Sequence, residues 1–364
     1  MLKRGQKLTT LRHKIGQMLI MGFSGISLDE PNPIKDWLSS DGVGGILLFD
    51  YDLRQNRQGK NLVNQAQIKQ LTNQLKHYAK MSPHNLDGLV PFIAIDYEGG
   101  AVDRLRHIDG CIKTKQPTEL TALSEEALEL EIGKMAETLK QLGFNLNFAP
   151  VVDLNLNEEQ GIIGKLGRSF SADSQQVARV AKKFVEIFAE QGITCCYKHF
   201  PGHGSALGDT HHGFVDVTDT FQMVELEPYS SLLKNSDLSA MVMTAHVINR
   251  KLDENGLPAT LSKAILTGLL RNKIGFDGVI ISDDLQMQAI ASHYSIDEAL
   301  ELTINAGADM LIFANQLGEI TATEVIDRIE KLVHSQKIEK ERIEEAYQRV
   351  MRLKQTLLEP ALMQ

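Results

Sequence analysis

The chain has 364 residues, of which 47 are acidic and 38 are basic, and its formal net charge is −9. The lysines and arginines are scattered, so no basic stripe is available to the phosphates of a nucleic acid or to an acidic membrane surface, and neither is expected as a partner. Length alone does not require two domains, since α/β barrels often exceed about two hundred residues around one core. We expect a single domain over residues 1–364, with no second domain.

No segment has the pattern of an export signal or of a membrane span. The apolar run 15–23 is interrupted by two glycines and a glutamine and lacks a cleavage site, and no other run approaches the roughly 20 apolar residues of a spanning helix. Of the three cysteines, Cys195 and Cys196 are neighbours in an apolar run, where a disulfide between them would be strained. We therefore expect a cytoplasmic protein, and we expect a monomer.

Eight short apolar runs recur along the chain, and each is interpreted as a strand. Because the runs are nearly continuous instead of alternating, the strands are expected to be buried on both faces. In chain order, the runs are 18–23, 45–49, 91–95, 146–152, 194–197, 240–245, 279–281 and 310–313.

Segments with helical periodicity lie between these runs. After Asp173, apolar side chains from Val177 to Phe188 return at the three- and four-residue intervals of one helical face. Asp173 and Gln176 predict a capping box at the start of this helix, and Gly192 predicts its end. The segments 128–142, 261–274, 297–305, 324–333 and 339–357 also read as helical, and a glycine follows the first of them.

Eight strands that alternate with seven or eight helices predict an α/β fold, a single (β/α)8 TIM-type barrel with its active site at the C-terminal ends of the strands. The alternative is an open doubly wound sheet, which needs a Gly-rich phosphate-binding loop after the first strand. Residues 22–25 match such a motif poorly. Polar residues follow seven of the runs, on the face where barrel enzymes carry their chemistry: Asp50, Asp96, Asp153, Lys198 with His199, His246, Asp283 and Asn315.

The segment 198–211 is expected to form the centre of the active site. Four of the eleven histidines lie between residues 199 and 212. His199 and His203 have the four-residue spacing of a zinc pair, but Pro201-Gly202 prevents the helix that would bring them onto one face. We therefore expect no metal and no other cofactor. The glycines indicate a loop that moves and delivers its second half when substrate is bound.

Three residues are the candidate catalytic groups. Asp209 lies two residues from His211, so its carboxylate can orient the imidazole and raise the imidazole pKa from about 6.5 toward neutrality. Asp283, at the end of a buried strand, is a candidate nucleophile, while Asp284 is expected to cap the turn that follows. These parts predict acid-assisted displacement at a sugar anomeric centre with retention of configuration.

The motif KHFPGHG at 198–204, followed by DTH at 209–211, resembles the signature of the bacterial β-N-acetylglucosaminidases of glycoside hydrolase family 3. The resemblance continues in order over nearly the whole chain, in IGQM at 15–18, DYEGG at 96–100, FAPVVD at 148–153, GRSF at 167–170, TAHVI at 244–248, 278–285 and AGADM at 306–310.

The resemblance implies a role for each candidate residue. Asp283 is the nucleophile, His211 is the acid and base, and Asp209 tunes His211. Asp96, Arg104, Arg168, Lys198 and His199 hold the N-acetylglucosamine ring in the non-reducing-end subsite. The implied substrate is a muropeptide fragment of cell-wall recycling, in which the sugar is joined to anhydro-N-acetylmuramic acid.

Some features depart from the family pattern and leave alternatives open. Many relatives, above all β-glucosidases, carry a second α/β domain, which we do not expect in this chain. Tyr97 and Ala101 stand where compact members commonly have Gln and Arg, the polar segment 50–65 is long, and Gln286 and His212 have no physical explanation from the sequence. A β-glucosidase-like hydrolase, a catalytically silent sugar-binding barrel and a metal-dependent hydrolase that uses three histidines remain as alternatives. Whether phosphate can replace water as acceptor stays open.

Overall fold

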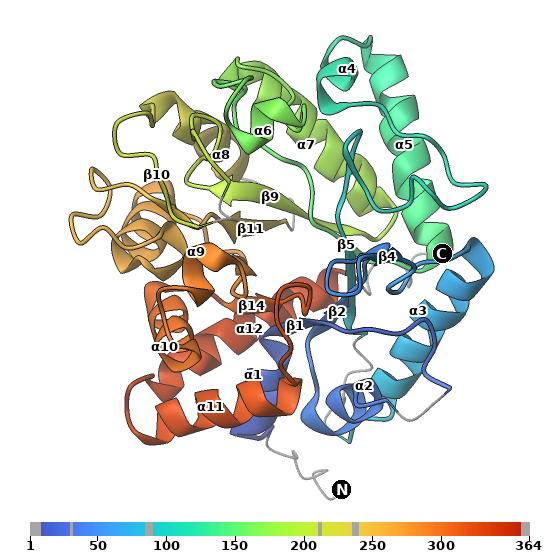
Figure 1. The fold of residues 1–364 in the computed structure, drawn as a ribbon, viewed down its shortest axis with the longest axis vertical. Helices are drawn as coiled ribbons and strands as arrows, with labels where there is room; N and C mark the ends of the chain where they lie inside the picture. Colours follow the sequence, from blue (N-terminus) through green and yellow to red (C-terminus); the bar gives the residue numbers. More distant parts are fainter. Residues whose placement is uncertain (1–8, 30–31, 84–89, 210–212, 235–239, 358–364) are drawn as a thin grey trace, which may run out of the picture.

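A computed structural model describes residues 9–29, 32–83, 90–209, 213–234 and 240–357. Eight parallel strands close into one barrel, in the spatial order β1-β14-β13-β11-β9-β8-β5-β2 (Figure 1). β1 closes the ring, because it pairs with β14 through Leu19 and Leu311 on one edge and with β2 through Ile20 and Gly45 on the other. The predicted barrel is confirmed. Its strands are β1 (Leu19–Gly22), β2 (Gly45–Leu47), β5 (Phe92–Ile95), β8 (Leu146–Asn147), β9 (Thr194–Phe200), β11 (Met241–Thr244), β13 (Ile280–Asp284) and β14 (Met310–Phe313).

Two strands differ in length from the prediction. β8 ends as a regular strand at Asn147 instead of residue 152, but the segment after it keeps backbone hydrogen bonds to both neighbours: Phe148 N donates to the Ile95 carbonyl (2.9 Å), and the Ala149 carbonyl accepts from Cys196 N (2.8 Å). Pro150 lies within this segment and has no N–H to donate. β9 extends past the predicted end, so that Lys198, His199 and Phe200 belong to the strand itself.

The helices surround the barrel (Figure 1). Asp173 caps α7, because its carboxylate accepts from the backbone N of Gln175 (2.8 Å) and Gln176 (3.0 Å), but the predicted capping box does not form, since the Asp173 N–H donates to Ser171 Oγ (3.1 Å). The segment 261–274 is helical but not a single α-helix, since it divides into a short 3-10 turn and a π-helix. The helical elements are α1 (Leu11–Gln17), α2 (Ile34–Asp36), η1 (Trp37–Asp41), α3 (Gln65–Lys80), α4 (Pro117–Thr121), α5 (Glu125–Leu142), α6 (Ile162–Lys165), α7 (Ser174–Glu190), η3 (Met223–Leu226), α8 (Glu227–Leu233), η4 (Ala259–Leu261), η5 (Ala264–Ile274), α9 (Gln288–Ala291), α10 (Ile296–Ala306), α11 (Ala322–His334) and α12 (Lys340–Thr356).

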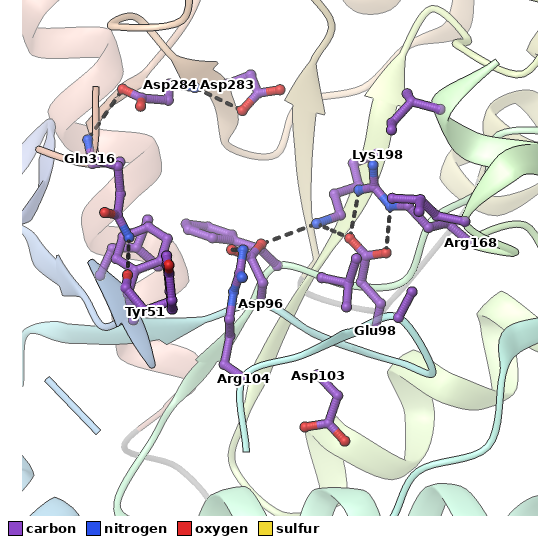
Figure 2. A pocket seen from close by; sticks show the side chains of 18 of the residues that line it. Tyr51, Asp96, Glu98, Asp103, Arg104, Arg168, Lys198, Asp283, Asp284 and Gln316 are labelled. Carbon is purple, nitrogen blue, oxygen red and sulfur yellow. Dashed lines mark hydrogen bonds and ion pairs between the residues drawn. The ribbon is translucent and has the colours of Figure 1, made fainter. Parts of the chain in front are cut away.

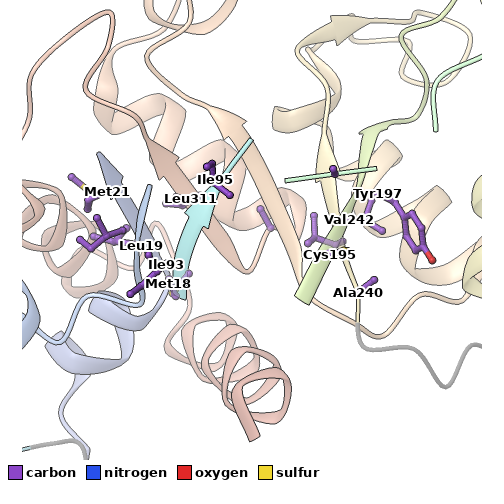
Figure 3. Packing of buried hydrophobic residues seen from close by; sticks show 14 of the residues in the cluster. Met18, Leu19, Met21, Ile93, Ile95, Cys195, Tyr197, Ala240, Val242 and Leu311 are labelled. Carbon is purple, nitrogen blue, oxygen red and sulfur yellow. The ribbon is translucent and has the colours of Figure 1, made fainter. Parts of the chain in front are cut away.

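Alternate residues of each strand pack into two separate hydrophobic layers. Leu19 and Met21 belong to the layer between strands and helices, part of which Figure 3 shows, whereas Ile20 belongs to the layer that fills the barrel. Cys195 and Cys196 divide in the same way, so their thiols lie in different layers. Successive side chains of a strand point to opposite faces, and both faces here are apolar, which explains the continuous apolar runs of the sequence.

The C-terminal helix α12 packs against the N-terminal end of the barrel. Leu353 joins the interior layer, and the neighbouring Lys354 Nζ donates to Gln17 Oε1 (2.7 Å) and to the Gly44 carbonyl (2.8 Å). With this end covered, the C-terminal ends of the strands are left for the site. Among the described residues, no helix is both long enough and apolar enough to cross a membrane.

Short strand pairs stand outside the barrel. The hairpin of β3 (Tyr51–Asp52) and β4 (Arg57–Gln58) follows β2, and the pair β6 (Tyr97–Gly99) and β7 (Val102–Asp103) follows β5. β10 (Val215–Asp216) runs parallel to β12 (Val247–Ile248). These pairs rise from the C-terminal ends of the barrel strands and shape the mouth of the barrel.

Candidate active site

A pocket of about 580 Å³ opens at the C-terminal ends of the strands. Its lining includes every predicted site residue that the structure describes, namely Asp96, Arg104, Arg168, Lys198, His199, Asp209 and Asp283. His211, the predicted acid and base, lies outside the described residues. The barrel therefore brings together side chains that are up to about two hundred residues apart in the sequence.

A buried row of charges forms one side of the pocket. Glu98 accepts from Arg168 through two bonds, from Nε (2.8 Å) and Nη2 (2.7 Å), and its Oε1 lies 2.6 Å from Lys198 Nζ (Figure 2). Burial alone would raise the pKa of Glu98, but the two cations outweigh it and hold that pKa far below its usual range. Burial would lower the pKa of Lys198, yet Glu98 and Asp96 raise it above its usual value. Glu98, Arg168 and Lys198 are therefore all charged at neutral pH.

Asp96 and Arg104 continue this row toward the pocket mouth. Asp96 Oδ1 lies 3.2 Å from Lys198 Nζ, and Asp96 Oδ2 lies 3.6 Å from Arg104 Nη2. The Arg104 guanidinium is also 3.7 Å from Asp50 Oδ1 and lies over the ring of Phe49. Carboxylates beside cationic forks can grip vicinal hydroxyls through several charge-assisted bonds, so this row is suited to a sugar ring.

His199 is oriented by a buried carboxylate. Asp153 Oδ2 lies 2.7 Å from His199 Nδ1, and the other oxygen accepts from the backbone N of His203 at 2.8 Å. Burial would raise the pKa of Asp153, but the neighbouring imidazoles and backbone donors lower it, so Asp153 is an anion. Asp153 is thus a support for His199 and does not line the pocket.

Among the described residues, His199 and His203 are not part of a metal centre. Burial lowers the pKa of His203 to about 4, so this ring is neutral at physiological pH. Over the described ranges, no group of three or more His, Cys, Asp or Glu side chains converges in the way that metal ligands do. The metal-dependent alternative gains no support from this part of the chain.

The loop after β9 is anchored in its first half. Glu225 Oε2 accepts from the backbone N of Gly204 (3.1 Å) and of Ser205 (3.3 Å), and Asn157 Nδ2 donates to the carbonyl of Ala206 (3.1 Å). His203 to Ala206 are buried, whereas Leu207 is exposed and Asp209 is half-buried. The movement predicted for the loop can therefore concern only the part beyond Ala206, where it stays a prediction.

Asp283 lies on β13, on a different strand from the charged row (Figure 2). Its Oδ1 accepts from the backbone N of Asp284 at 2.8 Å, and its side chain lines the pocket. Asp284 has the predicted capping role, because its Oδ1 accepts from the backbone N of Gln286 (3.1 Å) and of Ala314 (3.2 Å). Asp283 thus lines the same pocket as the charged row, and its strand β13 lies on the opposite side of the barrel from β5, which precedes Asp96.

Two other predicted strand-end residues do not line the pocket. His246 lies between the hydroxyl of Thr260 (2.8 Å) and the carbonyl of Asp284 (2.9 Å). Asn315 donates through Nδ2 to the carbonyls of Gly22 (2.9 Å) and Ile320 (3.0 Å). Both join neighbouring strand ends to one another, so a polar residue after a strand need not face the site.

Two buried glutamates of the site were missed by sequence reasoning. Glu98 stands only within the DYEGG motif, and Glu225 lies in none of the motifs. Their partners Arg168, Gly204 and Ser205 are distant in the sequence, so no local pattern identifies the pairing.

A parallel barrel with a carboxylate- and cation-lined pocket at the C-terminal ends of its strands defines a class of enzyme that includes many glycoside hydrolases. Residues 10–353 match the Glycosyl hydrolase family 3 N terminal domain, and the chain belongs to glycoside hydrolase family 3.

Two of the relatives are named β-hexosaminidase, and a similar solved structure is named β-N-acetylglucosaminidase. The chain is 30% identical to β-hexosaminidase A of Pseudoalteromonas piscicida, over 90% of this chain and 56% of that one, and 33% identical to β-hexosaminidase of Tolumonas auensis, over 82% of each. A solved family 3 β-N-acetylglucosaminidase from Paenibacillus superposes with a TM-score of 0.84 at 32% identity, over 96% of this chain and 63% of that one. The chain thus spans little more than half of the first relative and under two thirds of the solved structure.

Proposed function

We propose that the protein is a retaining β-N-acetylglucosaminidase that removes N-acetylglucosamine from the non-reducing end of muropeptide fragments. The observation that carries the proposal is the shared pocket, in which Asp209 and Asp283 stand together with the charged row of Asp96, Glu98 and Lys198. Relatives named β-hexosaminidase support N-acetylglucosamine as the sugar that is removed. The motif resemblance supports a muropeptide as the substrate and the cytoplasm as the location.

In the first step, the sugar is held against the charged row with its anomeric carbon at Asp283. An Asp283 oxygen attacks that carbon, the glycosidic bond breaks, and His211 gives a proton to the leaving oxygen. Asp209 accepts a hydrogen bond from the imidazole and stabilises its protonated form. The products are the free leaving group and a glycosyl ester of Asp283.

In the second step, His211 takes a proton from a water molecule as that water attacks the anomeric carbon. The ester bond to Asp283 breaks, and the sugar leaves with its original configuration.

The test compares the wild-type protein with Asp283→Ala on an aryl N-acetyl-β-glucosaminide. We expect a loss of several orders of magnitude, because the variant has no nucleophile. Asp36→Ala, which removes an exposed carboxylate on α2, is the matched control and should keep wild-type rates. Equal rates in Asp283→Ala and the wild type would refute the proposal.

Product analysis separates the substrate classes. Anhydro-muropeptides, N-acetylchitobiose and an aryl glucoside are offered to the same preparation, and we expect the muropeptide to have the highest kcat/KM. A preference for the glucoside would establish the glucosidase alternative instead. The acid role is tested with His211→Ala, which should lose far more rate on poor leaving groups than on activated aryl ones.

A further inference from the structure

The long polar segment after β2 forms one wall of the pocket together with the loop 315–320. Gln316 joins the two, because its Nε2 donates to the carbonyl of Tyr51 (2.8 Å) and its Oε1 accepts from the backbone N of Leu53 (3.1 Å). Arg54 Nη1 lies 2.7 Å from Glu319 Oε2 farther out on the same wall. We call residues 51–58 and 315–319 the leucine wall, after the side chains described below.

The leucine wall is fixed to the strand that carries Asp283. The side chain of Gln286 accepts from the backbone N of Asn315 (2.7 Å) and donates to Asn315 Oδ1 (3.0 Å). Lys60 Nζ donates from below to Gln316 Oε1 (3.1 Å). Burial lowers the pKa of Lys60, which is consistent with its position beneath the wall. These bonds give Gln286 a structural role and make the wall a built feature of the site.

The leucine wall presents apolar side chains to the pocket. Leu53 and Leu317 line the pocket, although 53% and 43% of their surfaces are exposed to solvent. Met287, three residues beyond the capping Asp284, lines it as well. The wall adjoins the Arg104 end of the charged row, because Arg104 lies 3.7 Å from Asp50, directly before the wall. A second apolar part of the lining comes from Ile162, Ile163 and Leu166.

The orientation of the sugar decides what meets the leucine wall. This step rests on the proposed function, in which the ring hydroxyls face the charged row and the anomeric carbon faces Asp283. Asp283 attacks from one face of the anomeric carbon, so the leaving group departs on the opposite face and extends out of the pocket toward solvent. Leu53 and Leu317 line the pocket but are largely exposed, whereas Glu98 and Lys198 are buried, so the two leucines stand at the mouth where the leaving group emerges.

We propose that Leu53 and Leu317 form the leaving-group subsite, and that this subsite takes a leaving group with an apolar ring face, such as the C–H face of a pyranose. Contact with such a face removes both leucines from water, which stabilises the bound substrate. Leu53, which belongs to the segment 50–65, and Leu317 thus contribute to the choice of glycoside.

The test uses the double variant Leu53→Ser with Leu317→Ser and two substrates. N-acetylchitobiose has a pyranose leaving group, whereas N-acetyl-β-glucosaminyl fluoride releases an ion too small to reach the wall. We expect kcat/KM to fall by about tenfold or more on the disaccharide, mainly through KM, and to stay within about twofold on the fluoride. Both leucines are exposed, so polar replacements should not disturb folding.

The matched control is Leu130→Ser, which makes the same change at an exposed position of the outer helix α5 (59% exposed) and should leave both substrates unchanged. Equal effects of the double variant on both substrates, or no effect on the disaccharide, would overturn the subsite. A wild-type protein that cleaves no N-acetylglucosaminide would instead refute the proposed function, so the two failures are distinguishable.

Discussion

Replacement of Glu98 by Gln is the sharpest probe of the charged row. Glu98 has a side chain that is 1% exposed and contacts Arg168 and Lys198 at 2.6 to 2.8 Å. In the buried part of the row, the carboxylates of Glu98 and Asp96 balance the cations of Lys198 and Arg168. The variant leaves one uncompensated positive charge in a buried place.

The expected cost follows from that imbalance. Loss of one partner of a buried ion pair costs about 3–5 kcal/mol, so Glu98→Gln should lower the free energy of unfolding by that amount. Because the pKa of Glu98 lies far below its ordinary 4.5, the wild-type contribution is at full size above about pH 4.5 and declines as the pH falls below it. The difference between the two proteins should shrink in that acidic range.

The assay is urea unfolding at pH 7 and at pH 4, together with kcat/KM on an aryl N-acetyl-β-glucosaminide. Glu129→Gln is the matched control, because the Lys183–Glu129 pair has a similar distance of 2.8 Å but is exposed, and its loss should cost less than about 1 kcal/mol. A Glu98→Gln variant within 1 kcal/mol of the control at pH 7, with unchanged kcat/KM, would refute the reasoning.

Three further predictions concern buried charges outside the charged row. Glu225→Gln places an amide against the backbone donors of the loop after β9 and should lower kcat on poor leaving groups by about tenfold or more. The control Glu227→Gln, in the next turn, should not lower kcat. Equal kcat in both variants would exclude a positioning role for Glu225. Asp309→Asn should cost about 3–5 kcal/mol in urea unfolding, because three arginines surround that buried carboxylate, and a loss below 1 kcal/mol would contradict this. Lys354→Met should be at least as stable as the wild type at pH 6, because burial lowers the pKa of Lys354 to about 7, so folding below that pH must bury a charge. The stability advantage of the variant should decrease between pH 7 and pH 10. Lower stability of the variant at pH 6 would show that the hydrogen bonds of the lysine dominate.

The barrel was predictable from the sequence because its signals are local. Each strand is a continuous apolar run, since both of its faces are covered, and Asp173 caps its helix through bonds to residues two and three positions away. The end of β8 was predicted too late, because the apolar pattern continues through Pro150, where the chain keeps hydrogen bonds to its neighbours but not the regular geometry of a strand.

The sequence predicted which residues lie in the pocket better than it predicted which side chains contact one another. Placement after a strand predicted that Asp96, Lys198 and Asp283 would meet at the mouth of the barrel, and they line one pocket. The same rule could not distinguish His246 and Asn315, which turn toward neighbouring strand ends, because side-chain direction after a strand depends on the turn that follows.

The central claim is that Asp283 forms a covalent bond to the sugar, and mass spectrometry tests it directly. A 5-fluoro-N-acetylglucosaminyl fluoride reacts fast through its fluoride leaving group, while the ring fluorine slows hydrolysis of the ester. After incubation and proteolysis, we expect the added mass of one fluorinated sugar on the peptide that contains Asp283, and no such adduct in Asp283→Ala. An active protein that carries the label on another residue, or that turns the probe over without any adduct, would contradict the account.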